Sequence, residues 1–219
     1  MTQRKHYVTS LQDLNHNILK MGTLVEEAIR KSVKSLTEQN IGLSEKVIKE
    51  DEIINQMELD IQNQCTTLIA AEQPVAGDLR NIITVLKIIT QLERMGDHAV
   101  HIAKAAIRLE KETFMKPIID IPRMAEIGIE MLREILTAFI TGDSEKAIRY
   151  AALDDEIDNL HDQITREILT YMMEDPKFIK QSITFLFISR FLERFGDHAT
   201  NISEWIVYNV TGKHVELNN

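Results

Sequence analysis

The sequence predicts an all-α protein built from two tandem, antiparallel three-helix bundles that are related by internal duplication. Three observations support this fold class. Leu, Ile, Ala, Met, Glu and Lys, which favour helices, are abundant, whereas aromatic residues make up only 5% of the 219-residue chain. The 8 Gly and 4 Pro residues are too few for the many turns of a β-fold. The third observation is a long internal repeat.

The repeat consists of short segments that recur in the same order. Residues 92–99 (LERMGDHA) and 192–199 (LERFGDHA) are identical at seven of eight positions, at an offset of 100. Upstream, the pattern Asp-Glu-Ile-x-Asn occurs at 51–55 and again at 155–159, at an offset of 104. A proline stands between the two segments in each half, at Pro74 and Pro176. This order indicates a gene duplication, and we predict two domains, 1–112 and 113–219.

The first half is expected to contain three helices. Apolar residues recur every three or four positions from Leu11 to about Asn40, as they do on one face of a helix. A second helix is expected from about Ser44 to Glu72, and a third from about Val75 to Lys111. Gln73-Pro74 should turn the chain between them, because proline disfavours helical backbone in the preceding residue. Short turns make neighbouring helices antiparallel, so this half should form an elongated bundle.

The second half repeats this pattern. Its helices are expected from Ile121 to about Gly142, from a cap at Ser144 to Met173, and from the turn at Asp175-Pro176 to about Val210. Proline is well tolerated near a helix N-terminus, which suits that last turn. The segment from Glu110 to Arg123 contains two prolines and is the expected hinge between the halves.

Composition and charge argue against several classes of protein. No run of 18 or more apolar residues could span a membrane, and the first residues do not resemble a signal peptide. The lone Cys65 cannot form an internal disulfide, so we expect a buried thiol and a reducing, cytoplasmic compartment. A formal net charge of −9 without a basic stripe disfavours binding to nucleic acid.

Common catalytic motifs are also missing from the sequence. It has no glycine-rich phosphate loop, no HExxH motif and no serine in a nucleophile elbow, and Cys65 has no convincing histidine partner. We therefore expect a protein that is not a conventional enzyme.

Acidic side chains are predicted to gather at one level of the first bundle. Glu93 and Asp97 are one helical turn apart and share a helix face. When two antiparallel helices are joined near residues 73 and 74, the numbers of facing residues add up to about 147. Asp51 paired with Asp97, and Asn55 paired with Glu93, both come within one of this total. Four oxygen-bearing side chains should therefore meet.

The second bundle shows the same coincidence, with an ambiguity. Glu193 and Asp197 are again one turn apart, and a turn near residue 175 makes facing numbers add up to about 350. Two overlapping pairs on the preceding helix come close to this total, and spacing leaves open which one joins the cluster. These pairs are Asp154 with Asp158, and Asp155 with Asn159.

Clustered carboxylates repel one another unless something neutralises them. A hard cation such as Mg²⁺, Mn²⁺ or Ca²⁺ would do so through oxygen ligands, and iron or zinc also accept carboxylates. Interhelical salt bridges are the alternative, since Arg94 and Arg194 directly follow the glutamates and Arg190 lies one turn away. The sequence leaves both interpretations open.

Glycine and histidine accompany both acidic pairs. Glycine in mid-helix costs about 1 kcal/mol relative to alanine, so Gly96 and Gly196 indicate the close approach of a helix, a metal or a partner, with helix packing the simplest interpretation. His98 and His198 point roughly 100° away from the preceding aspartates around the helix, and a surface position is the simplest interpretation for them.

The repeated segments resemble those of the PhoU family of phosphate-transport accessory proteins, over nearly the whole chain. The doubled Glu-Arg-x-Gly-Asp segment is the most specific part of the resemblance. The residues that carry it are Leu14, Met21, Asp51-Glu52-Ile53, Asn55, Pro74, Asp78-Leu79-Arg80, Leu92 to Asp97, Asp155 to Asp158, Tyr171 to Pro176 and Leu192 to Asp197.

The resemblance implies a fold, a function and partners. The family fold is two tandem three-helix bundles. Its members restrain the phosphate-starvation response, and are thought to couple the ATPase subunit of a phosphate ABC transporter to a phosphate-sensing histidine kinase at the membrane. They often form homodimers, and some carry metal clusters on Glu/Asp-x-x-x-Asp motifs, which Glu93 with Asp97 and Glu193 with Asp197 match. The first pair on the partner helix, Asp51 with Asn55, departs from that pattern by one amide.

Together these observations favour a cytoplasmic negative regulator of the phosphate-starvation response that reaches the membrane only through its partners. One alternative is a metal-storage protein or a carboxylate-bridged metalloenzyme, for which the acidic clusters argue. Another is a purely structural bundle in which those clusters are salt-bridged.

Overall fold

The structure is a computed structural model that describes the backbone of residues 2–217 and the side chains of residues 9–217. All regular secondary structure in this part of the chain is helical, and it contains no strand. In chain order the helices are α1 (Thr2–Thr37), α2 (Ile41–Glu72), α3 (Gly77–Arg108), α4 (Asp120–Thr141), α5 (Ser144–Ala151), α6 (Asp154–Glu174), the short 3₁₀ helix η1 (Pro176–Phe178) and α7 (Ile179–Thr211).

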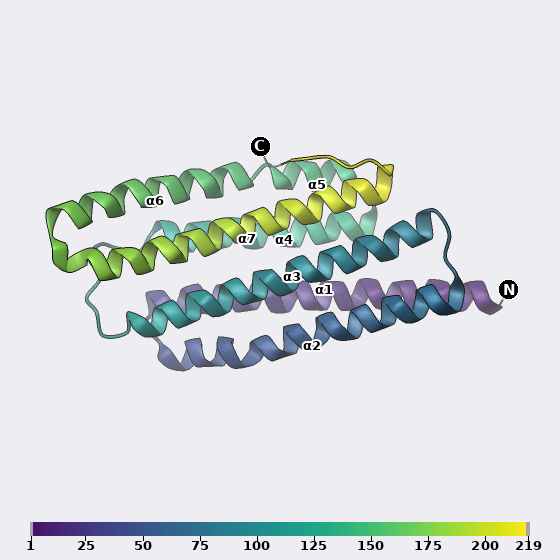
Figure 1. The fold of residues 1–219 in the computed structure, drawn as a ribbon, viewed down its shortest axis with the longest axis horizontal. Coiled ribbons are helices and arrows are strands. Elements are labelled where there is room, and N and C mark those ends of the chain that lie inside the picture. Colours follow the sequence, from purple (N-terminus) through teal and green to yellow (C-terminus); the bar gives the residue numbers. More distant parts are fainter. Residues whose placement is uncertain (1, 218–219) are drawn as a thin grey trace.

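The helices form two elongated bundles that lie side by side (Figure 1). Helices α1, α2 and α3 pack against one another, as do α4, α6 and α7, with the short α5 against α4 and α7. The bundles meet where α3 packs against α7 and α1 against α4. The predicted fold class, two antiparallel three-helix bundles related by duplication, is confirmed.

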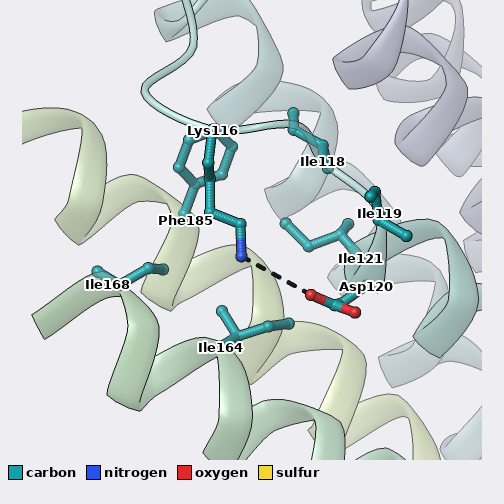
Figure 2. A pocket seen from close by; sticks show the side chains of 8 residues that line it. All are labelled: Lys116, Ile118, Ile119, Asp120, Ile121, Ile164, Ile168 and Phe185. Carbon is teal, nitrogen blue, oxygen red and sulfur yellow. Dashed lines mark ion pairs between the residues drawn. The ribbon is translucent and has the colours of Figure 1, made fainter. Parts of the chain in front are cut away.

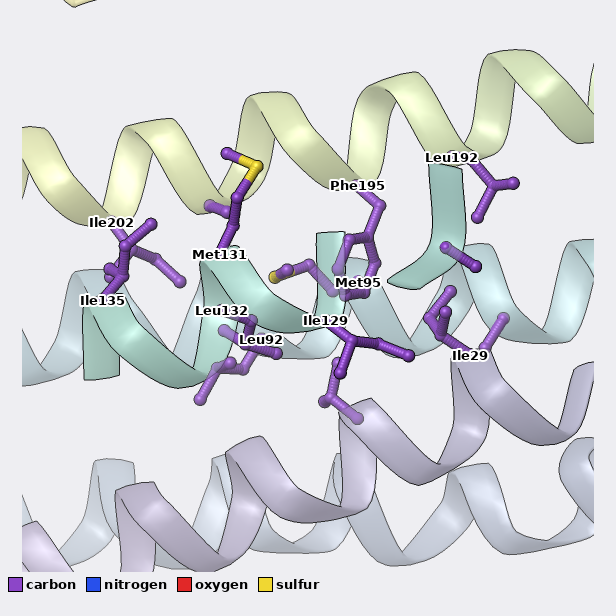
Figure 3. Packing of buried hydrophobic residues seen from close by; sticks show 14 of the residues in the cluster. Ile29, Leu92, Met95, Ile129, Met131, Leu132, Ile135, Leu192, Phe195 and Ile202 are labelled. Carbon is purple, nitrogen blue, oxygen red and sulfur yellow. The ribbon is translucent and has the colours of Figure 1, made fainter. Parts of the chain in front are cut away.

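The predicted apolar stripes are the core of both bundles. On α1 they include Leu14, Ile18 and Met21, each at most 1% exposed. Figure 3 shows side chains of α1, α3, α4 and α7 in one continuous apolar layer, in which Phe195 reaches from α7 toward α4. Because the core continues from one half into the other, packing does not itself mark a boundary, and the division between residues 112 and 113 remains a prediction.

The turns lie where the sequence places them, with one correction. Gln73 ends α2 in the left-handed conformation, at φ 47°. Asp175 accepts a hydrogen bond from the backbone N–H of Lys177 and so caps η1. Ser144, however, is not the cap of α5. Asp143 has this role, because its side chain accepts a hydrogen bond from the N–H of Lys146 at 2.9 Å.

The prediction of one continuous helix from Ser144 to Met173 is wrong, because the helix is interrupted at Ala152 and Leu153. There the backbone tightens, and the N–H of Leu153 bonds the carbonyl of Tyr150, three residues back. Helix α6 then begins at Asp154, and three acidic residues occupy its first turn. The positive end of the helix dipole favours negative charge at this place.

Two further expectations concern burial and membranes. Cys65 is fully buried, and burial raises the pKa of its thiol to about 12, as expected for a structural cysteine. Among the described helices, none contains a stretch that is long and apolar enough to cross a bilayer.

Candidate functional site

The first acidic cluster lies between α2 and α3, at the level that the hairpin register predicts. A Cβ atom on Gly96 would lie only 3.3 Å from Oδ1 of Asp51, so this carboxylate rests against the glycine. Asn55 donates a hydrogen bond from Nδ2 to Oδ2 of Asp51 at 3.3 Å. The negative charges of Asp97 and Asp51 both raise the pKa of Glu93. The structure therefore brings the four predicted side chains together.

Burial is the main cause of the pKa shifts in this cluster. It raises the pKa of Asp51, and the charge of Asp97 adds to the effect. It also raises the pKa of Glu93, followed by the charges of Asp97 and Glu58. Glu58 was missed in the sequence, although its number and that of Thr90 fit the same facing total. Thr90 donates a hydrogen bond to Oε1 of Glu58 at 3.2 Å.

The second acidic cluster lies between α6 and α7 and resolves the ambiguity of register. Asp154 is only 5% exposed, and a Cβ atom on Gly196 would overlap its Oδ1. Ile157 lies beside it, as Ile54 lies beside Gly96 in the first bundle. Asp154 is therefore the counterpart of Asp51, at an offset of 103 rather than the 104 that the Asp-Glu-Ile pattern suggests.

Asp158 joins Asp154 in this cluster, whereas Asn159 does not. Burial raises the pKa of both aspartates; the charge of Asp158 adds to the shift of Asp154, and the charge of Asp197 adds to that of Asp158. Asn159 is exposed and donates its side-chain N–H to the backbone carbonyl of Asp155 at 2.6 Å. Asp155 is exposed at the rim. It lines an open, polar hollow of about 440 Å³ together with Asp154, Asp158, Glu193 and Asp197.

Burial raises the pKa of the carboxyl groups in the second cluster. Burial raises the pKa of Asp154 to about 7, although the hydroxyl of Thr200 donates to its Oδ2 at 2.8 Å and opposes the shift. Burial is also the first cause of the raised pKa of Glu193, and the charge of Asp197 adds to it. Arg190 forms an ion pair with Glu193 at 2.5 Å, which is a partial neutralisation without metal.

Several buried oxygen atoms in the two clusters have no hydrogen-bond partner. They are Oδ1 of Asp51, Oδ1 of Asn55, Oδ1 of Asp154 and Oε2 of Glu193. Buried polar atoms in proteins nearly always have a hydrogen-bond partner, so these four oxygens are exceptions. All are hard oxygen donors of the kind that Mg²⁺ and Ca²⁺ prefer, and the donor set therefore fits a cation.

The donor atoms are not already gathered around a single point. Within the part of the chain that the structure describes, no group of three or more His, Cys, Asp or Glu side chains is close enough to hold an ion as it stands. The fit thus rests on the unpaired oxygens and their chemistry.

The expectation of surface positions for His98 and His198 is wrong. The two rings stack on each other at the contact between α3 and α7, with centroids 5.2 Å apart. Burial lowers the pKa of His98 to about 3 and that of His198 to about 4. Nδ1 of His198 lies 2.7 Å from Oε1 of Gln91. Both imidazoles are therefore neutral packing groups between the bundles, and neither faces an acidic cluster.

A separate cavity lies beneath the segment that joins the two halves (Figure 2). It is lined mainly by isoleucines and Phe185, and Lys116 bridges Asp120 and Glu167 at its edge. Its volume of about 20 Å³ has room for about one water molecule. The cavity is therefore a packing defect rather than a ligand site.

Comparison with known proteins gives one family for both halves. The family model of the PhoU domain matches residues 18–106 and again residues 121–206. A protein of Clostridium acetobutylicum, named as a phosphate-specific transport system accessory protein PhoU homolog, is 40% identical over 98% of this chain and 99% of its own length. The Pseudomonas aeruginosa protein of the same name is 36% identical over 96% of this chain and 88% of its own length.

Solved structures agree with the sequence comparison. The crystal structure of PhoU from Pseudomonas aeruginosa superposes with a TM-score of 0.90 at 36% identity, covering 94% of this chain and 100% of that one. The phosphate transport system regulatory protein PhoU from Streptococcus pneumoniae gives a TM-score of 0.89 at 33% identity, covering 96% and 99% of the two chains.

Proposed function

This chain belongs to the PhoU family, and we propose that it is a cytoplasmic regulatory protein that restrains the phosphate-starvation response and modulates phosphate uptake. The observation that carries the proposal is the match of both repeats, end to end, to accessory proteins of the phosphate-specific transport system. The missing catalytic motifs also support a regulatory rather than a catalytic role.

In this proposal the protein acts as an adaptor. It contacts the ATPase subunit of a phosphate ABC transporter and a phosphate-sensing histidine kinase, and holds the kinase inactive when phosphate is plentiful. It acts as a homodimer and needs no nucleic acid. The extended outer surfaces of two long bundles suit a protein whose work is contact with other proteins.

The acidic clusters are proposed to bind one divalent cation or iron site in each bundle. The residues that would hold it are Asp51, Asn55, Glu93 and Asp97 in the first bundle, and Asp154, Asp158, Glu193 and Asp197 in the second. The unpaired oxygens of Asp51, Asn55, Asp154 and Glu193 support this assignment, because a bound cation would satisfy them. The cation would supply positive charge that fixes the two helices of each hairpin together.

A deletion strain tests the regulatory proposal. Without the protein, a reporter of phosphate-starvation genes should be active in high-phosphate medium, and the wild-type gene on a plasmid should restore repression. A deletion strain that stays fully repressed in high phosphate would contradict the proposal.

An activity assay distinguishes the regulatory proposal from the metalloenzyme alternative. Metal-loaded protein should turn over neither phosphoesters nor peroxide, because the sequence carries none of the common catalytic motifs and the proposed role of the cation is to hold the helices together. Turnover that disappears in a Glu93→Ala, Asp97→Ala double variant would favour the alternative.

A further inference from the structure

Two apolar side chains of α7 remain exposed on the face where α7 crosses α3. Ile183 is 43% exposed and Phe187 is 57% exposed, one helical turn apart on the same side of the helix. Large apolar groups scattered singly on a surface are ordinary, but an adjacent pair on one face often marks a contact site. Phe187 touches only Phe191 among the described aromatic rings, at 6.4 Å.

The internal duplication shows that this exposure is specific to the second half. At an offset of 100, Phe187 stands where the first half has Lys87. The ammonium of Lys87 lies over the ring of Trp205 on α7, 5.2 Å from its centroid, so the residue at this position in the first half contacts an aromatic ring of the second half. The position that corresponds to Trp205 is Ala105, which is too small to cover Phe187 in return.

Positive side chains lie at both ends of this apolar pair. The antiparallel register of α3 and α7 is fixed by contacts such as Thr84 with Trp205 and Gln91 with His198. It places Arg94 level with Arg194 on one side of Phe187, and Arg108 level with Lys180 on the other. All four cations are exposed, and none forms an ion pair with an acidic residue in the described part of the chain.

We define the α3/α7 patch as these six residues: Arg94, Arg108, Lys180, Ile183, Phe187 and Arg194. It spans about 14 residues of α7, which is roughly 21 Å at 1.5 Å per residue. Two of its cations also adjoin the acidic clusters, since the charge of Arg94 acts on Glu93 and that of Arg194 acts on Glu193 and Asp197. Four exposed cations around an apolar pair nevertheless contrast with the net charge of −9.

We propose that the α3/α7 patch is a docking site for an acidic amphipathic helix of a partner protein. The exposed Ile183 and Phe187 would bury the apolar stripe of that helix, and its carboxylates would face the four cations. Complementary charge of this kind raises the association rate and selects acidic partners over basic ones. The inference goes beyond the proposed function, because it assigns a surface and a partner chemistry without depending on the transporter or the kinase.

A membrane fits this patch less well than a helix does. The apolar part is one helix wide, and α2 and α6 lie on either side of the α3–α7 pair (Figure 1). Both flanking helices carry exposed carboxylates, such as Asp60 and Asp162, which an anionic bilayer would repel. A single acidic helix can lie along the patch without reaching them.

The direct test uses a synthetic helical peptide of about 20 residues with Leu at every third or fourth position and Glu on both flanks. Its binding to the full-length protein is measured by calorimetry at low and high salt, beside the same peptide with Lys in place of Glu. The Glu peptide should bind, more weakly at high salt, and the Lys peptide should bind at least tenfold more weakly.

Two double variants locate the site. Ile183→Ser with Phe187→Ser, and Arg108→Glu with Lys180→Glu, should each weaken binding of the Glu peptide at least tenfold. The matched controls on α2, Leu59→Ser and Lys49→Glu, remove one exposed apolar group and one exposed cation and should bind like wild type. All changed side chains are exposed, so circular dichroism should show unchanged helix content.

Four results would overturn the proposal. The first is no binding of the Glu peptide, and the second is equal binding by wild type and both patch variants. The third is equal binding of the Glu and Lys peptides. The fourth is that the patch variants still bind the Glu peptide but lose binding to vesicles or to a second copy of this chain. In this fourth case, wild-type binding to phosphatidylglycerol vesicles would indicate that a membrane occupies the patch. Wild-type self-association in ultracentrifugation would instead indicate that a second copy of this chain does.

Discussion

Asp51 lies half-buried against Gly96 and accepts a hydrogen bond from the amide of Asn55, whereas its counterpart Asp154 is 5% exposed and accepts one from the hydroxyl of Thr200. Position 55 carries an amide in the first bundle, and its counterpart is the carboxylate of Asp158 in the second. The two clusters therefore occupy the same level of the same fold with different chemistry.

The groups that neutralise each cluster also differ. Thr90 of the first bundle corresponds to Arg190 of the second, which pairs with Glu193. Glu58 correspondingly gives way to His161, whose Nδ1 lies 3.0 Å from Oγ of Ser189. The duplication thus kept the backbone geometry and the Glu-x-x-x-Asp pairs, and changed the partners around them. The element that the two bundles share is therefore the pair of facing carboxylates, and a cation common to both would bind there.

The largest expected difference concerns the two glycines. A Cβ atom on Gly196 would overlap Asp154, whereas one on Gly96 would meet Ile54 at 3.2 Å and Asp51 at 3.3 Å, which a small shift relieves. Gly196→Ala should therefore destabilise the protein by about 1–3 kcal/mol, as overpacked cores do. Gly96→Ala should change stability by less than about 1 kcal/mol, because alanine is the better helix former. Urea unfolding of both variants measures this, and equal effects would break the comparison.

The second prediction concerns the proton on Asp154 in metal-free protein. Burial raises its pKa from 3.8 to about 7, so the folded protein keeps a proton that the unfolded chain has released between these pH values. Stability due to this group is therefore fully present below pH 4 and falls as the pH rises to about 7. Asp154→Asn stays neutral and should be more stable than wild type by about 2 kcal/mol at pH 8.

The measurement is thermal unfolding in chelator at pH 4 and pH 8, where a gain of 2 kcal/mol corresponds to roughly 4–8 °C for a chain of this size. The difference between variant and wild type should be much smaller at pH 4. Asp51→Asn is the control from the first bundle, and its gain should be smaller because Asp51 is less buried. A larger gain for Asp51→Asn would reverse the comparison.

The smallest expected effect comes from the threonine that distinguishes the second cluster. Thr200→Val removes the hydroxyl that donates a hydrogen bond to Oδ2 of Asp154, and should cost about 1–2 kcal/mol at pH 8. Val100→Thr offers Asp51 the same hydroxyl in the first bundle and should change stability by less than about 1 kcal/mol. Unfolding curves of the two variants measure both effects. A Thr200→Val variant with the same free energy of unfolding as wild type would show that this hydrogen bond does not stabilise the protein.

Much of the fold follows from local sequence patterns. The apolar spacing in α1 and the turns at Gln73 and Asp175 predicted the helices and their antiparallel order. The hairpin register, together with the repeat, predicted that Asp51 and Glu93 meet. These features depend only on helical periodicity and loop length, which a sequence shows directly.

The remaining features depend on packing that local patterns do not show. Asp154 and Asp155 are both acidic, and the Asp-Glu-Ile pattern matched Asp155, so only the contact with Gly196 reveals the offset of 103. The interruption at Ala152 contains neither glycine nor proline to mark it. The stacking of His98 on His198 depends on how one bundle packs against the other, and each bundle alone gives no sign of it.

The most direct test of the account is the metal content of protein purified without chelator, measured by elemental analysis. The account predicts bound cation in wild type, with Glu93→Ala plus Asp97→Ala losing only the share of the first bundle, and Glu193→Ala plus Asp197→Ala losing only that of the second. Wild-type protein that stays metal-free after being offered Mg²⁺, Mn²⁺, Zn²⁺ and Fe²⁺, or double variants that keep the full wild-type content, would contradict it.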